Sequence, residues 1–282
     1  MTTTRPTTII RIPRSLVALR DVCASKSVRY ALDCVHVERR AGVARATATD
    51  GKMLIRASWD DAGPDVADVL VPSDEWKTSR STTSRRELAL HVTAGSLALD
   101  GRGLPDVEKT YPPVEDVLPR ATREESRVTL DAVQLFAVGR ALFAHGEALA
   151  ALGVYASGGG DFVALDFTGP DALCTGVAVR GSFHGESKKR ERLYFPALNP
   201  HAKHADLESP PKSVGLNPRL LHRLADAMAR AAGTRDGDDA PLPVMLGIAD
   251  AHSSMRVTLA NPGTGPVRLE AVLMPITLES GS

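Results

Sequence analysis

The chain has 282 residues, which is enough for one large domain or two of ordinary size. Its 34 basic and 34 acidic residues balance, so no overall charge indicates a nucleic-acid or membrane partner, and charge could act only through its distribution between faces. Cys23, Cys34 and Cys174 form no CxxC pair, which predicts reduced thiols. No run reaches the about 18 apolar residues of a membrane span, and the amino terminus lacks a signal-peptide core, so we expect a soluble cytoplasmic protein.

The first half of the chain reads mainly as strands. The expected elements are a strand over 7–12, a helix over 13–25, a strand within 30–40, a hairpin over 43–59, a strand over 68–72, a short helix from Ser73 and a hairpin over 87–101. Asp50-Gly51 marks the first hairpin turn, because both residues tolerate positive φ, and Ala94-Gly95 lies near the turn of the second hairpin. The stretch 104–126 is rich in proline and charge and is typical of a linker between domains.

The second half repeats this order. We expect a strand over 126–131, a helix over 132–148, a hairpin over 152–169, a strand over 173–183, a polar insertion over 184–212 with a short strand at 193–195, a helix over 217–233, and strands over 244–250, 254–261 and 268–278. In the last helix Asn217 is the expected cap, Pro218 the first helical residue and Gly233 the stop. The repetition predicts an internal duplication: domains 1–120 and 121–282, each an α+β unit with two helices on one side of antiparallel sheets.

The predicted helices carry more basic than acidic residues, while acids collect in loops such as 58–68. Such a distribution can bind a phosphate backbone on one surface without sequence preference. Charge alone favours ordinary solvated helix faces over this function. The candidate DNA-binding residues are Arg14, Arg20, Lys26, Lys77, Arg80, Arg140, Arg219, Arg223 and Arg230.

Five stretches carry a resemblance to a known family, in the family's order along the chain. They are VRYAL (28–32), ATDGKMLIRA (48–57), YPPVEDVLP (111–119), VGLNPRLLHRLADAM (214–228) and LEAVLMPI (269–276). They resemble the bacterial DNA sliding clamp, the beta subunit of DNA polymerase III, in its middle and last domains. Lys52-Met53 departs from the family's histidine-arginine, Leu220-Leu221 from its tyrosine-leucine, and Thr277-Leu278 from its Arg-Leu ending.

The resemblance implies an apolar pocket between the two domains that binds polymerase and clamp-loader peptides. Its residues would be Leu32, Thr49, Gly51, Lys52, Met53, Leu54, Pro119, Val272, Met274 and Pro275. Methionine and proline near an exposed turn suit varied peptides, although the carboxyl-terminal stretch also fits an ordinary core strand. The family has three such domains and six-domain rings, so a two-domain chain implies a homotrimeric ring around double-stranded DNA.

Other chemistry has little support in the sequence. His201 and His204 lack an acidic or cysteine partner at ligand spacing, and the SGGGD stretch at 157–161 lacks the Lys-Ser/Thr of a phosphate loop. We therefore expect no catalysis, no cofactor and no metal. The alternatives are an enzyme with a small ligand at the domain junction, and a non-ring clamp-like peptide-binding regulator of replication or repair.

Overall fold

The computed structural model has two compact units. The described residues are 7–28, 30–77, 86–118, 126–133, 136, 154–156, 161–166, 175–180, 213–234, 240–248, 253–261, 265–275 and 278–280. The first unit contains residues 1–115, 226–235 and 262–271, and the second contains 116–225, 236–261 and 272–282. In the described part of the chain, no helix is long and apolar enough to cross a membrane.

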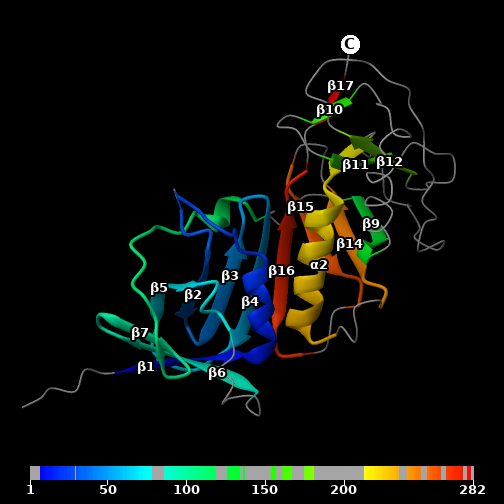
Figure 1. The fold of residues 1–282 in the computed structure, drawn as a ribbon. Helices are drawn as coiled ribbons and strands as arrows, with labels where there is room; N and C mark the ends of the chain where they lie inside the picture. Colours follow the sequence, from blue (N-terminus) through cyan, green and yellow to red (C-terminus); the bar gives the residue numbers. More distant parts are fainter. Residues whose placement is uncertain are drawn as a thin grey trace, which may run out of the picture. The chain divides into compact units, whose positions relative to one another are not determined.

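Antiparallel strands make up most of the first unit (Figure 1). They are β1 (Thr8–Pro13), β2 (Cys34–Arg40), β3 (Val43–Thr49), β4 (Met53–Asp60), β5 (Val66–Pro72), β6 (Glu87–Thr93), β7 (Ser96–Leu99) and β8 (Arg102–Gly103). One sheet has the order β1-β6-β7-β8 and the other the order β5-β2-β3-β4. After β4 comes β16 (Arg268–Leu273), whose residues 268–271 belong to this unit.

The segment after β1 is a 3-10 helix, η1 (Arg14–Asp21), and not the longer helix expected over 13–25. Leu16 and Leu19 of η1, and Val22 directly after it, are fully buried and stand three positions apart. A 3-10 helix aligns residues i and i+3, so this geometry buries all three side chains on one line. The expected helix is therefore present, but it is shorter than 13–25 and has the 3-10 geometry.

A turn follows β5 where a short helix was expected from Ser73. The N–H groups of Glu75 and Trp76 both bond to Pro72 O, 3.0 Å away. Trp76 is fully buried, and its Nε1 donates to Leu16 O at 2.8 Å. Burying one indole against η1 outweighs the local helix signal, because an aromatic side chain contributes a large apolar area. Residues 78–85 lie outside the described part.

Both predicted hairpins of this unit are confirmed. β3 and β4 pair from Val43↔Asp60 to Thr49↔Leu54, and β6 and β7 pair across Thr93↔Ser96. Gly51 and Gly95 have φ values of +86° and +96°, which explains why glycine stands at each turn.

A buried ion pair joins β2 to the loop after β4. Arg39 Nη1 lies 2.6 Å from Asp61 Oδ2, and the two side chains are 1% and 3% exposed. The guanidinium also donates to Ile9 O of β1 at 2.9 Å, and Trp59 Nε1 donates to Arg11 O of the same strand at 2.7 Å. Side chains of one sheet thereby hold the main chain of β1.

The stretch 104–126 was expected to be a linker, but its described residues up to Glu115 pack on the first unit. Lys109 Nζ donates to Asp33 Oδ2 at 2.9 Å, and Ala31 N donates to Thr110 O at 3.0 Å. A short 3-10 turn, η3 (Val114–Asp116), follows. Proline and charge carried no information on what this segment contacts.

The second unit is also built of antiparallel strands. They are β9 (Ser126–Asp131), β10 (Val154–Ala156), β11 (Asp161–Asp166), β12 (Thr175–Arg180), β13 (Ser213–Leu216), β14 (Pro243–Ile248), β15 (Met255–Leu259) and β17 (Leu278–Ser280). The strand orders are β15-β14-β9, β12-β11-β13 and β10-β17. The hairpin expected over 152–169 is wrong, because β10 pairs with β17 while β11 pairs with β12 and β13. A glycine-rich stretch permits a turn without selecting the partner strand.

Helix α2 (Pro218–Ala232) has the predicted boundaries. Asn217 Oδ1 accepts hydrogen bonds from the N–H groups of Arg219 and Leu220 at 3.0 and 3.3 Å, and Gly233 ends the helix with a φ of +68°. These are the standard polar cap and glycine stop. Of the helix expected over 132–148, only Ala132, Val133 and Phe136 are described, and they are helical. The insertion at 184–212, with its expected strand at 193–195, lies outside the described residues.

The described part therefore consists mostly of antiparallel sheets with few helices. The expectation of two helices on one side of the sheets in each half stays a prediction, as do the domain limits 1–120 and 121–282.

Candidate functional site

The turn between β3 and β4 is held by two side chains. Thr49 Oγ1 donates to Met53 O at 2.7 Å and accepts from Gly51 N at 3.0 Å. Asp50 Oδ1 accepts from the N–H groups of Lys52 and Met53 at 2.9 and 3.0 Å. Because a side chain satisfies each exposed backbone donor, the turn presents a fixed shape at the surface.

The structure brings Leu32 to this turn. A Cβ atom at Gly51 would lie 3.7 Å from Leu32 Cδ1, so the leucine side chain borders the glycine backbone. Gly51 and Lys52 are exposed, whereas Met53 and Leu54 are only 2% and 3% exposed. Of the residues predicted here, Leu32, Gly51 and Lys52 offer surface, and the side chains of Met53 and Leu54 belong to the core.

The carboxyl-terminal candidates lie in the second unit. Val272 is buried, Pro275 is partly exposed, and Met274 is 40% exposed directly after β16. An exposed methionine is an adaptable apolar contact for a varied ligand. Pro119, the remaining candidate, lies outside the described residues.

The basic candidates of the first unit sit on η1 and in the turns near it. Arg14 and Lys77 are partly exposed, and Arg20 and Lys26 are exposed. Lys77 Nζ lies 3.9 Å from Glu75 Oε1. Arg80 and Arg140 lie outside the described residues, so the structure neither supports nor opposes their assignment.

On α2 the buried and the exposed residues lie on different faces. Leu221, Leu224 and Met228 are buried, whereas Arg219 and Arg230 are exposed. Arg223 and Asp226, on the same side as the two exposed arginines, are partly exposed. The apolar stripe and the polar stripe therefore follow the helical period.

Arg230 is held by two carboxylates. Its Nη2 donates to Asp21 Oδ2 and to Asp226 Oδ2, each 2.7 Å away, and Arg20 Nε lies 3.4 Å from Asp21 Oδ1. Asp21 is a contact that sequence reasoning missed, since it stands 209 positions from Arg230 and no local pattern links them. It lowers the positive charge that this part of the predicted DNA-binding surface presents.

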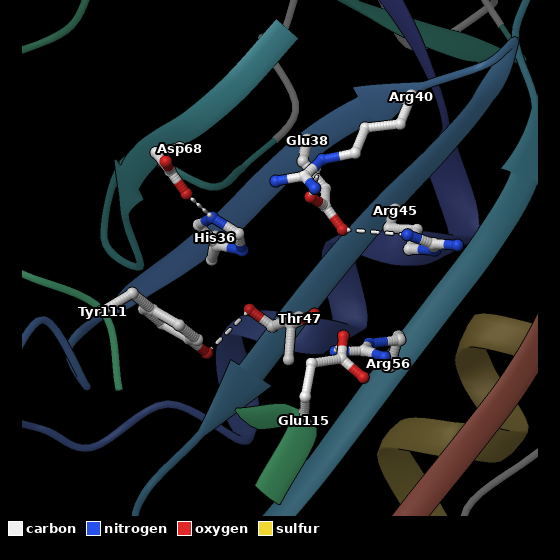
Figure 2. Close-up of polar contacts among 9 residues, drawn as sticks. All are labelled: His36, Glu38, Arg40, Arg45, Thr47, Arg56, Asp68, Tyr111 and Glu115. Atoms are coloured by element: carbon white, nitrogen blue, oxygen red, sulfur yellow. Dashed lines mark hydrogen bonds and ion pairs between the residues drawn. The ribbon is translucent and has the colours of Figure 1, made fainter. Parts of the chain in front are cut away.

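A second polar cluster covers one face of the β2–β3–β4 sheet (Figure 2). His36 stacks on Tyr111 with ring centroids 4.9 Å apart, and Tyr111 donates its hydroxyl to Thr47 O at 2.9 Å. Burial raises the pKa of Tyr111 well above its ordinary value, and the nearby thiols add to this shift. Glu115, on the same segment as Tyr111, accepts a hydrogen bond from Arg56 Nη2 at 2.7 Å. No local pattern indicated this cluster, because its residues come from separate segments of the chain.

Metal-ligating side chains do not gather into a site in the described part of the chain. Among these residues no group of three or more histidine, cysteine or acidic side chains could hold a metal ion. His201, His204 and the glycines at 158–160 lie outside the described residues.

Comparison with solved structures relates this geometry to known proteins. Caulobacter crescentus pol III beta matches with a TM-score of 0.63 at 19% identity, covering 98% of this chain and 68% of that chain. A DNA polymerase sliding clamp from Pseudomonas aeruginosa matches with a TM-score of 0.61 at 21% identity, covering 95% and 65%. A putative DNA polymerase III beta subunit from Eubacterium rectale matches with a TM-score of 0.59 at 11% identity, covering 96% and 66%.

No protein-family model and no curated protein matches the sequence. The solved structures cover nearly all of this chain, while the chain spans about two thirds of their length. These matches, together with the antiparallel sheets and the two hairpins, show that this chain has the fold of the bacterial DNA polymerase III beta sliding clamps.

Proposed function

We propose that this protein is a DNA sliding clamp, or clamp-like processivity factor, that encircles duplex DNA and recruits polymerase and clamp-loader peptides. The observation that supports this most directly is the sliding-clamp fold over 95–98% of the chain. A fold alone does not establish a function, so the proposal also rests on the chemistry of the two predicted surfaces.

The proposed DNA contacts are exposed basic side chains on the helices and in the segment after η1. Arg20 and Lys26 in the first unit, and Arg219 and Arg230 on α2, reach solvent on flexible side chains. Such side chains bind phosphates without reading bases, and that independence of sequence is what sliding requires. The role is binding, and we propose no catalytic step and no cofactor.

The proposed peptide contacts combine a fixed turn with an adaptable apolar residue. The proposed contacts of the first unit are Leu32, Gly51 and Lys52, and those of the second unit are Met274 and Pro275. Main-chain exposure at a glycine and an exposed thioether are both suited to short linear peptides.

The ring is the proposal's most direct test. The rings of the family that this sequence resembles have six domains. If each copy contributes two domains, three copies complete such a ring, so native mass measurement should give a trimer. The protein should remain on nicked circular DNA and slide off the same DNA after linearisation. Blocking both ends of the linear DNA with bound protein should restore retention.

Equal loss from the circular and the linear DNA would contradict encirclement. If the protein still bound polymerase peptides in that case, the non-ring peptide-binding regulator would replace the clamp. Neutralisation of Arg230 by Asp21 and Asp226 is the observation that favours this alternative, because it weakens the attraction for phosphate.

A further inference from the structure

Three arginines lie on one face of β2, β3 and β4, and one of them binds an exposed carboxylate. Arg56 Nη2 donates to Glu115 Oε1 at 2.7 Å. Arg40 and Arg45 hold the two oxygens of Glu38 at 3.0 and 3.2 Å. The hydrogen bond from Arg56, and then the charges of all three arginines, lower the pKa of Glu115, so each of them acts on this carboxylate. We call Arg40, Arg45 and Arg56 the arginine face.

The pairing between Arg56 and Glu115 is incomplete. The Arg56 side chain is only 9% exposed. Its Nε is buried and has no hydrogen-bond partner among the described residues. The Nε–H and one Nη2–H point from the same edge of a guanidinium, and a carboxylate can accept from both. Glu115 accepts from Nη2 alone, so a buried donor stays unsatisfied.

Glu115 is also easy to displace. Its side chain is 72% exposed, and ion pairs at such exposure contribute little to stability. Arg56, in contrast, is fixed by its burial in β4. A partner's carboxylate that accepted from both Nε and Nη2 would satisfy the donor that Glu115 leaves unpaired.

The charge pattern distinguishes between an acidic peptide and a nucleic acid. Glu38 lies between Arg40 and Arg45, and Asp60 lies 3.0 Å from Arg268 on the neighbouring strand. Carboxylates thus interrupt the basic side chains at short intervals. A continuous phosphate backbone needs an uninterrupted basic track, whereas single carboxylates need only separate arginines.

We propose that the arginine face is a docking site for an acidic segment of a partner protein, in which one carboxylate replaces Glu115 on Arg56. Glu115 then acts as an internal substitute that keeps the site covered when no partner is bound. This docking requires neither a ring nor DNA, so it can fail while the proposed clamp function holds.

The test uses the full chain and a fluorescent hexaglutamate peptide, with hexaglutamine as the neutral peptide. Glu115→Gln removes the competing carboxylate and should tighten hexaglutamate binding about fivefold, as measured by fluorescence anisotropy at low salt. Glu108→Gln removes the same charge from an exposed position of the same segment and should change the affinity by less than about twofold. Hexaglutamine should bind neither variant.

Adding Arg45→Gln to the Glu115→Gln variant should return the hexaglutamate affinity to that of the wild-type protein. If that double variant fails to fold, Arg40→Gln serves the same purpose, because Arg40 is 63% exposed. Equal affinities of the Glu115→Gln and Glu108→Gln variants would overturn the proposal. Tighter binding of an oligothymidylate of equal charge, lost in the Arg45→Gln variant, would overturn it in favour of a nucleic-acid site.

Discussion

Arg39 and Asp61 form an ion pair that is almost wholly removed from solvent, with Nη1 and Oδ2 2.6 Å apart. Asp61→Asn would leave a buried guanidinium without its counter-charge, and we expect the free energy of unfolding to fall by about 3–5 kcal/mol. Urea denaturation followed by circular dichroism measures this change. A loss below about 1 kcal/mol would show that the charge of Asp61 contributes little.

Gly63 provides an independent probe of the same ion pair. A Cβ atom there would lie 2.6 Å from Arg39 Cζ, too close for the fixed guanidinium to tolerate. We expect Gly63→Ala to destabilise the protein by about 1–3 kcal/mol, as overpacking does. Gly265→Ala is the matched control, since no described residue has an atom within 4 Å of the added Cβ, and it should leave the urea midpoint unchanged.

The turn glycines separate stability from peptide binding. Gly51 and Gly95 both have positive φ, so replacing either with alanine should cost about 1–2 kcal/mol. Only Gly51 is a candidate for peptide contact, so Gly51→Ala alone should weaken binding of a polymerase-derived peptide measured by anisotropy. Equal peptide affinity in the two folded variants would move the peptide site away from this turn.

For the wider peptide surface, the exposed residues are the ones to change. Leu54→Ala would create a cavity and cost about 2–5 kcal/mol, because Leu54 is only 3% exposed. Lys52→Ala with Met274→Ala should instead weaken peptide binding while the unfolding free energy changes by less than about 1 kcal/mol. Unchanged affinity in this folded double variant would remove both residues from the site.

The DNA-binding prediction depends on salt. Arg219→Ala should weaken DNA binding and flatten the dependence of log affinity on log salt by up to about one unit. Arg230→Ala should have a smaller effect, because Asp21 and Asp226 already pair with Arg230. Asp21→Asn should strengthen binding. Unchanged salt slopes in all these variants, measured by titration at several salt concentrations, would remove the helix surface from the DNA site.

Cys34 gives a prediction for alkaline pH. Burial, and then the charge of Asp33, raise the pKa of the Cys34 thiol from 9.0 to about 11. A pKa raised by folding contributes stability that is complete below the unfolded value and is lost as pH rises through the folded value. The stability advantage of the wild-type protein over Cys34→Ala should therefore shrink between about pH 9 and pH 11. A constant difference in unfolding free energy across this range would contradict the raised pKa.

Local signals in the sequence predicted the parts of the fold that local chemistry determines. Asp50-Gly51 and the Asn217 to Gly233 boundaries of α2 follow from φ preference and capping, and both are confirmed. The turn at Ser73 was missed because burial of Trp76, against a residue 60 positions away, overrides helix propensity. The partner of β10 was missed for a similar reason, since pairing across the chain has no local signature.

In the candidate sites too, local sequence predicts some features and tertiary packing determines the others. The exposure of Arg219 and Arg230 follows from the helical period, whereas the pairing of Arg230 with Asp21 depends on tertiary packing. The contact of Leu32 with Gly51 was anticipated only through a family resemblance. Nothing in the sequence near Arg56 indicated that Glu115 would lie beside it, because 59 positions separate them.

β1 is an edge strand of its sheet, and its free edge affects how copies of this protein could join. Arg39 and Trp59 already occupy the carbonyl oxygens of Ile9 and Arg11, two acceptors that a neighbouring polypeptide would need in order to extend the sheet there. The protein's own side chains block this edge of β1. Subunits that associate by pairing their edge strands must therefore use a different sheet edge.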